Sequence, residues 1–138
     1  INDSMGEYIV KRIVKGLIKK KISPLNAKIL ILGFAFKENC PDIRNTKVID
    51  IIHGLESFGC QCVIYDPVVC PQKVLSEYGV HIYSSLLEVP CYTTADALVL
   101  AVSHDTFKNI IPKKTIRPDG FVFDMKSFFK REEIDERL

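Results

Sequence analysis

The sequence has too little net charge to indicate a nucleic-acid-binding protein, and no apolar run long enough to indicate a membrane protein. Its 19 lysines and arginines nearly balance 17 aspartates and glutamates, which leaves a net charge of +2 over 138 residues. Nucleic-acid-binding domains usually carry a concentrated basic surface. A membrane-spanning helix needs roughly 20 consecutive apolar residues, and no charged leader precedes an apolar block at the start. We therefore expect a cytoplasmic protein without a nucleic-acid or membrane partner.

Cysteine and histidine are too few and too scattered to predict a metal site. The five cysteines include no CxxC pair, and none of the three histidines lies at a zinc-site spacing from them. An odd number of cysteines without such a framework is typical of reduced thiols in a cytoplasmic protein. We expect structural thiols and no bound metal.

Strand-like and helix-like segments alternate along the chain. Short apolar runs are typical of strands buried in a parallel sheet, and the segments between them have the periodicity of amphipathic helices. This alternation predicts an α/β fold, a Rossmann-like doubly wound parallel sheet of about five strands in the order 3-2-1-4-5, preceded by a helix. We expect strands at 28–32, 62–65, 80–83, 95–102 and 120–124, and helices at 3–21, 48–58, 72–78, 106–111 and 128–138.

The loop after the first predicted strand lacks the glycine fingerprint of dinucleotide-binding domains. Such domains show GxGxxG at this point, whereas here Gly33 is followed by Phe34, Ala35 and Phe36. Bulky side chains would block the close approach of a pyrophosphate to the backbone. We therefore expect that this domain does not hold NAD by itself in the usual manner.

The same loop carries two cations with a proline between them. Lys37 and Arg44 lie in the run GFAFKENCPDIRNT at 33–46, and doubly wound folds bind ligands at the carboxyl ends of their strands. A lysine supplies a point charge and an arginine supplies a planar fork for phosphate or carboxylate. Both cations could contact one anion. The alternative is surface ion pairing with Glu38 and Asp42, which is common for loop cations.

Other polar residues near strand ends are open to more than one interpretation. Ser103, His104 and Asp105 are the three residue types of a catalytic triad, but the side chains of adjacent residues do not converge on one point as those of a triad must. We expect His104 to be a helix-entry or cleft-edge residue. Asp66 stands where Rossmann domains keep a ribose-binding acid, yet Asp-Pro is typical of a turn, which we favour. Lys126 follows the last strand and is a candidate third arm of an anion site.

Several blocks of the sequence resemble the C-terminal UDP-binding domain of the UDP-glucose/GDP-mannose dehydrogenase family. The branch that they resemble most is the UDP-N-acetylhexosamine 6-dehydrogenases of capsule and O-antigen synthesis. The blocks are GFAFKENCPDIRNTKVIDII at 33–52, YDP at 65–67, ADALVLAVSHDTF at 95–107 and VFDMK at 122–126.

The resemblance implies that the chain is one part of a larger enzyme. Residues 1–22 resemble the end of a central connecting helix, and residues 23–138 would form the UDP-sugar-binding domain. In the family, an N-terminal domain binds NAD, and a helical middle carries the catalytic cysteine and the dimer contacts. The reaction oxidises the C6 alcohol of the sugar twice, to a uronate. The implied partners are a UDP-sugar, the N-terminal domains of the same enzyme and a second copy in a homodimer.

The resemblance also implies roles for individual residues. Lys37 matches the lysine that reaches the nucleotide sugar, Phe36 adds backbone contacts, and Arg44 matches the arginine that reaches NAD. Lys126 stands where glucose-specific members have an arginine. The glycine- and histidine-containing motif of the catalytic cysteine is absent, so we expect no catalytic residue in this chain and no activity from it alone. The alternatives are a non-catalytic assembly or dimerisation module and a GDP-mannose 6-dehydrogenase domain.

Overall fold

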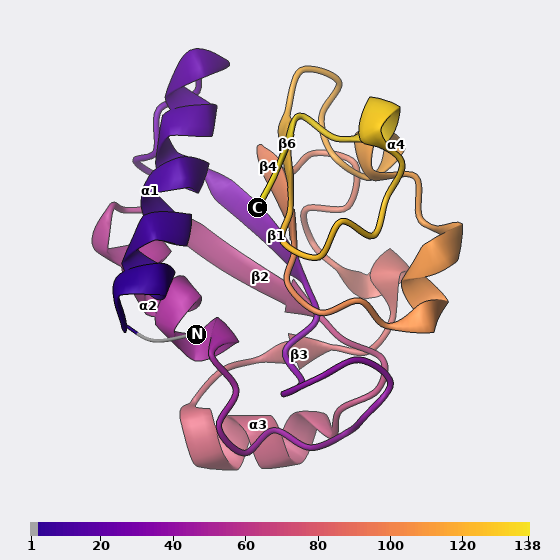
Figure 1. Cartoon of the computed structure of the whole chain (residues 1–138). Coiled ribbons are helices and arrows are strands. Elements are labelled where there is room, and N and C mark those ends of the chain that lie inside the picture. The colour runs from indigo at the N-terminus through magenta and orange to yellow at the C-terminus, as the bar shows by residue number, and fades with distance from the viewer. Residues whose placement is uncertain (1–2) are drawn as a thin grey trace.

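The computed structural model describes residues 3–138, and within them a single sheet of six strands is all parallel (Figure 1). The strand order is β3-β2-β1-β4-β5-β6. The predicted α/β class and the order of the first five strands are therefore confirmed, and a sixth strand is added. The strands are β1 (Lys28–Leu32), β2 (Gln61–Tyr65), β3 (Ile82–Tyr83), β4 (Ala97–Leu100), β5 (Phe121–Asp124) and β6 (Glu136–Arg137).

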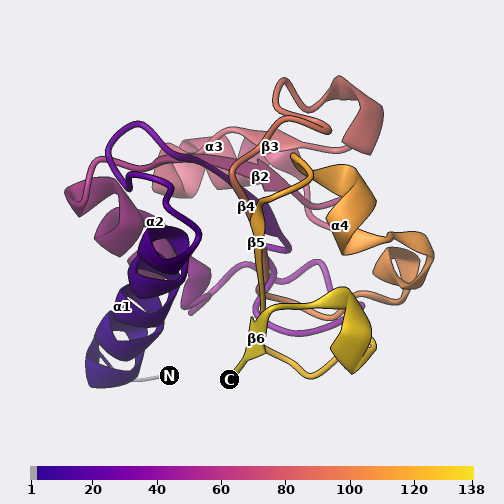
Figure 2. The same cartoon turned by 90° about the horizontal axis from the view of Figure 1, so that it is seen from above.

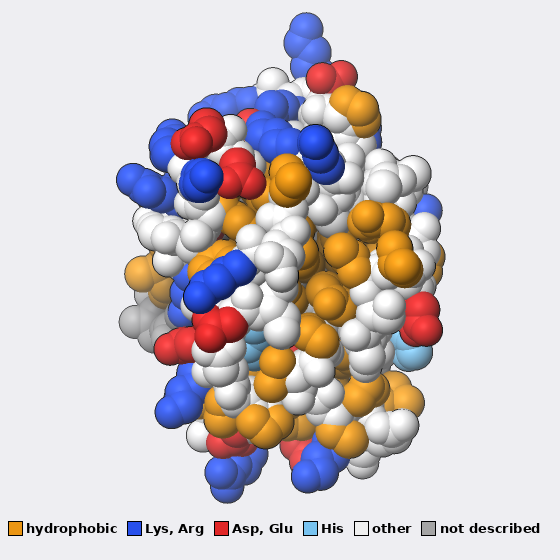
Figure 3. Space-filling model, turned by 90° about the vertical axis from the view of Figure 1, so that its right-hand side faces the viewer, with side chains coloured by type: hydrophobic (Ala, Val, Ile, Leu, Met, Phe, Trp, Pro, Cys, Tyr) orange, Lys and Arg blue, Asp and Glu red, His pale blue; other side chains and the backbone are white. Residues whose placement is uncertain are grey.

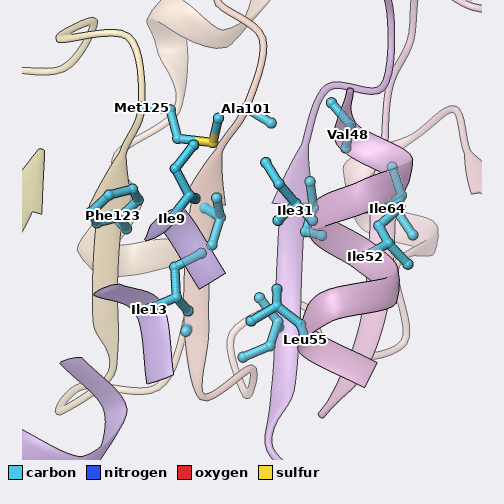
Figure 4. Packing of buried hydrophobic residues seen from close by; sticks show 14 of the residues in the cluster. Ile9, Ile13, Ile31, Val48, Ile52, Leu55, Ile64, Ala101, Phe123 and Met125 are labelled. Carbon is cyan, nitrogen blue, oxygen red and sulfur yellow. The ribbon is translucent and has the colours of Figure 1, made fainter. Parts of the chain in front are cut away.

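Three helices cover one face of the sheet, on the left in Figure 2. They are α1 (Asp3–Lys19), α2 (Val48–Ser57) and α3 (Pro71–Tyr78). Their apolar stripes are buried against the strands, as Figure 4 shows for Ile9 and Ile13 of α1 and for Ile52 and Leu55 of α2. Among residues 3–138, no helix has the length and apolar character needed to cross a membrane.

Short helical turns cover the opposite face. They are the 3₁₀ helices η1 (Leu86–Glu88), η2 (Asp105–Asn109) and η3 (Arg131–Glu133), and the single-turn helix α4 (Pro112–Thr115). Phe107 of η2, Ile116 directly after α4 and Phe129 shortly before η3 are buried in one cluster with apolar side chains of β1, β4 and β5. This covering is thinner than a layer of helices, and Figure 3 shows many apolar side chains reaching the surface on this side.

One predicted helix differs in type and bounds, and another is wrong. The short helix predicted at 106–111 is the 3₁₀ helix η2 at Asp105–Asn109, and Pro112 begins α4 instead of closing a helix, because a proline fits the first turn of a helix. Residues 128–138 form η3 and β6 in place of an amphipathic helix. There, Asp124 Oδ2 accepts the backbone N–H groups of Phe128 and Phe129 at 2.7 and 2.8 Å. Further on, Asp135 Oδ2 accepts the Val122 N–H at 2.8 Å, which attaches the segment to the sheet edge.

Candidate functional site

The loop after β1 leaves the sheet through a glycine that no other residue could replace without strain. Gly33 has φ 99°, a left-handed conformation that favours glycine. A Cβ at this position would lie 2.5 Å from the Cβ of Val102 and 2.9 Å from its backbone nitrogen. The start of the loop therefore packs directly against the residues that follow β4. From there the loop runs past the carboxyl ends of the strands and alongside α3 (Figure 1).

The first part of the loop is buried and tied to α3. Phe34 and Ala35 are both buried, and the Phe34 ring packs edge-on against Tyr78 with 5.3 Å between centroids. The Tyr78 hydroxyl donates to the carbonyl of Ile43 at 2.6 Å. Thr46 Oγ1 donates to the carbonyl of Phe34 at 2.7 Å, which joins the two ends of the loop. These contacts fix residues 33–46 at both ends.

Asp66 anchors the loop from the end of β2. Its side chain is fully buried. Oδ2 accepts the N–H groups of Phe34 at 2.7 Å and Ala35 at 3.2 Å, and Oδ1 accepts those of Val68 at 2.8 Å and Val69 at 3.3 Å. The predicted turn role of Asp66 is thus confirmed, and a loop-anchoring role is added to it.

The carboxyl of Asp66 is held in its charged form. Burial acts to raise the pKa of this carboxyl, but hydrogen bonds from His104 and from the N–H groups of Phe34 and Val68 act against it, and the net pKa is lowered. Both oxygens are engaged by protein donors, so Asp66 is not presented to a ribose.

His104 follows β4 and is fully buried beside Asp66. Its Nε2 lies 3.0 Å from Asp66 Oδ2, and its Nδ1 accepts the Asn39 N–H at 2.9 Å. The partners of the imidazole come from β2 and from the loop, and not from Ser103 or Asp105, so the residues at 103–105 do not form a triad. His104 directly precedes η2, which confirms the helix-entry prediction, whereas the cleft-edge alternative is wrong because the ring is buried.

The exposed tip of the loop borders a cavity of about 170 Å³. The cavity lies where β1, β4 and β5 end and α2 begins, which is the ligand-binding edge of doubly wound folds. Three lysines surround it, Lys37, Lys47 and Lys126, and all are exposed. Apolar side chains, including Val48 and Met125, form part of its wall. The structure therefore brings Phe36, Lys37 and Lys126 to one cavity, whose wall also includes the acidic residue Glu38.

Arg44 does not line this cavity. Its guanidinium is paired with Asp42 at 3.1 Å, and its side chain is 82% exposed. Hydrogen bonds from Arg44 lower the pKa of Asp42. This pairing is the surface alternative that the sequence left open, and the geometry does not support contact of Lys37 and Arg44 with one anion.

All five cysteines are free. Burial raises the pKa of Cys60, Cys62 and Cys91, which disfavours the thiolate that a nucleophile requires.

Lys47 is a cavity residue that the sequence analysis missed. Its position was readable in principle, since it immediately precedes α2 at the same sheet edge as Lys37. The contacts of Asn39 with His104 could not be predicted, because the two residues lie 65 positions apart.

Comparison with known proteins assigns the chain to a family. A family profile described as the UDP-glucose/GDP-mannose dehydrogenase family, UDP binding domain, matches residues 30–131. The chain belongs to this family. The resemblance that the sequence blocks indicated is thereby confirmed, and the loop, Asp66 and all the residues that line the cavity lie inside the matched region of this UDP-binding domain.

Individual relatives agree with the family assignment. The chain is 36% identical over 141 residues to the UDP-N-acetyl-D-glucosamine 6-dehydrogenase of Pseudomonas aeruginosa, and 39% identical over 142 residues to that of Salmonella typhi. Each match covers all of this chain and 32% of the relative, so the chain spans about a third of their length. A solved NDP-N-acetyl-D-galactosaminuronic acid dehydrogenase from Methanosarcina mazei Go1 superposes with a TM-score of 0.79 at 25% identity, covering 96% of this chain and 27% of the other.

Proposed function

We propose that this chain binds a UDP-sugar as the C-terminal domain of an NAD-dependent UDP-sugar 6-dehydrogenase. In this proposal residues 1–22 are the end of the connecting helix, and residues 23–138 are the binding domain. The observation that carries it is the lysine-lined cavity at the carboxyl ends of β1, β4 and β5, in a chain of this family. The names of the relatives favour a UDP-N-acetylhexosamine as the sugar nucleotide.

The cations around the cavity suit a diphosphate. Lys37 and Lys126 would make charge-assisted contacts to the nucleotide sugar, and Phe36 would contribute its backbone. The backbone at Lys126 is fixed, because its N–H donates to Asp124 Oδ1 at 2.8 Å. The lysine side chain itself remains exposed and available to a ligand.

Arg44 has a different role in this proposal. Its exposed guanidinium, directed by Asp42, would reach NAD bound mainly by the N-terminal domain of the enzyme. The catalytic cysteine would also come from outside residues 1–138. The two-step oxidation of the C6 alcohol to a uronate is therefore a property of the whole enzyme, which we expect to be a cytoplasmic homodimer.

Calorimetric titration of UDP into this chain tests the proposal. Lys37→Ala should weaken UDP binding, while Lys73→Ala, which removes an exposed lysine on α3, should leave it unchanged. A parallel titration with GDP separates a UDP-sugar domain from a GDP-mannose domain. Equal affinities of wild type and Lys37→Ala would contradict the assignment of the cavity.

An assembly role is a second candidate. A cavity of about 300 Å³ opens between α1 and α2, lined by residues that include Gly6, Val10, Asp50 and Gly54. Tyr8 on α1 is 50% exposed. Light scattering on the isolated chain checks this alternative, since a dimer that binds no UDP would favour it over the nucleotide-sugar proposal.

A further inference from the structure

A chain of hydrogen bonds runs from the exposed loop tip into the core. The Asn39 N–H donates to His104 Nδ1 at 2.9 Å, and His104 Nε2 lies 3.0 Å from Asp66 Oδ2. The same Asp66 oxygen accepts the Phe34 N–H at 2.7 Å, near the start of the loop. The ends of β2 and β4 are thus connected to both the beginning and the tip of the loop.

The hydrogen-bond partners define the form of the imidazole. A backbone N–H can only donate, so Nδ1 must accept from Asn39 and carries no proton. The ring proton then sits on Nε2 and is donated to Asp66 Oδ2. His104 is therefore a neutral ring with one acceptor facing the loop and one donor facing the carboxylate. Each ring nitrogen therefore makes a different hydrogen bond, and a separate substitution can remove each bond.

Asn39 is held a second time through its side chain. Its Oδ1 accepts the N–H of Asp105 at 2.8 Å, immediately after His104. Its φ of 58° lies in the left-handed region, which asparagine adopts more readily than most residues. Main chain and side chain of Asn39 are thus both bonded to residues 104–105. Lys37 lies only two residues earlier in the chain.

We propose that Asn39, His104 and Asp66 are positioning residues that hold Lys37 at the cavity. This inference rests on the proposed function. Within the described residues none of the three lines the cavity, so their effect on a ligand must act through the loop. A loop ordered before binding loses less conformational entropy when the ligand arrives. Loosening this connection should therefore weaken binding without removing any ligand contact.

Two substitutions at His104 separate the proposal from general destabilisation. His104→Gln keeps a donor near the Nε2 position and loses the acceptor for Asn39. His104→Asn keeps an acceptor near the Nδ1 position and loses the donor to Asp66. Both remove the ring that packs beside Phe107, and His104→Asn loses more packing than His104→Gln because its side chain is one methylene shorter. His104→Gln should release the loop tip more than His104→Asn, because it removes the bond to Asn39 itself, whereas His104→Asn removes only the bond between His104 and Asp66.

Hydrogen exchange of the ligand-free chain gives the first readout. In His104→Gln the Asn39 amide should exchange on the order of 10-fold faster than in His104→Asn, because local opening follows the loss of its acceptor. The second readout is UDP affinity, which should fall on the order of 5-fold in His104→Gln relative to His104→Asn, since the loop must then be ordered on binding.

Asn39 supplies a second pair of variants that does not disturb the core. Asn39→Gly removes the acceptor for the Asp105 N–H without adding strain at positive φ, and Asn39→Asp keeps an acceptor. Faster exchange of the Asp105 amide in Asn39→Gly than in Asn39→Asp supports the proposal. Equal exchange at Asn39 in both His104 variants, together with equal exchange at Asp105 in both Asn39 variants, overturns it. If wild type does not bind UDP, the proposed function fails, and the exchange rates still decide whether these residues hold the loop.

Discussion

The root and the tip of the loop after β1 differ in almost every physical respect. At the root, Phe34 and Ala35 are buried and both their N–H groups are bonded to Asp66. At the tip, Phe36 is 53% exposed and Lys37 is exposed as well. The comparison shows how a flexible cation can be placed reliably. Buried backbone hydrogen bonds fix where the loop starts, so that exposed side chains can remain free to meet a ligand.

Two aspartates, one buried and one at the surface, show the same difference between the two parts of the loop. The pKa of Asp66 is lowered by buried hydrogen bonds that outweigh the effect of burial, whereas the pKa of Asp42 is lowered by Arg44 in an exposed ion pair. Removing the buried acid leaves its donors without partners and without water. Removing the exposed acid lets water replace it.

The largest expected effect is therefore at the root. Asp66→Ala would leave the N–H groups of Phe34 and Ala35 and the His104 ring unsatisfied, and should lower the free energy of unfolding by about 3 kcal/mol or more. Asp42→Ala is the matched control at the exposed end and should cause no resolvable change. Urea unfolding of both variants makes the comparison, and similar losses in the two would remove the distinction between root and tip.

Gly33 provides the next test of the root. Gly33→Ala adds a clash with Val102 to the strain of positive φ and should cost about 2–3 kcal/mol of stability. Gly79→Ala has φ 70° but no atom within 4 Å of the added Cβ, so it should cost only about 1 kcal/mol. The difference between the two midpoints of urea unfolding measures the cost of the clash with Val102 separately from the cost of the positive φ. A cost at Gly79 as large as that at Gly33 would show that strain alone matters.

Acid should weaken the root through Asp66. Because the folded pKa of this carboxyl lies below its ordinary value of 3.8, its contribution to stability is complete above that value. It is lost as the pH falls through the lower folded pKa. The free energy of unfolding should thus drop more steeply below about pH 4 in wild type than in Asp66→Asn. Parallel curves for the two proteins would show that Asp66 is not an anchoring charge.

The smallest effect on stability is expected at the tip. Lys37→Ala and Arg44→Ala should both unfold like wild type, because the two side chains are exposed. They should differ in binding. Lys37→Ala should weaken UDP binding about tenfold through the loss of a charge-assisted contact, and Arg44→Ala should leave UDP binding of this chain unchanged. Equal losses of affinity would mean that both cations contact the same ligand.

The success and failure of the sequence predictions follow from the range of the interactions involved. The runs at 28–32 and 48–58 were assigned correctly because their apolar periodicity is local. Strand β6 was missed because Asp135 must reach Val122, 13 residues away, to attach this segment to the sheet. The Asp66–His104 pair was missed because the two residues, 38 positions apart, meet only when β2 and β4 flank β1.

The sequence by itself determined the alternation of strands and helices, the absence of a glycine fingerprint and the placement of Lys37 and Lys126 at one sheet edge. Parallel strands account for the last of these results, because their carboxyl ends all lie at the same edge of the sheet. Only the tertiary structure decided that Arg44 pairs with Asp42 away from the cavity and that Asn39 is bonded to His104. Those outcomes depend on the path of the loop after β1. Buried contacts between residues that are distant in the sequence hold that path in place.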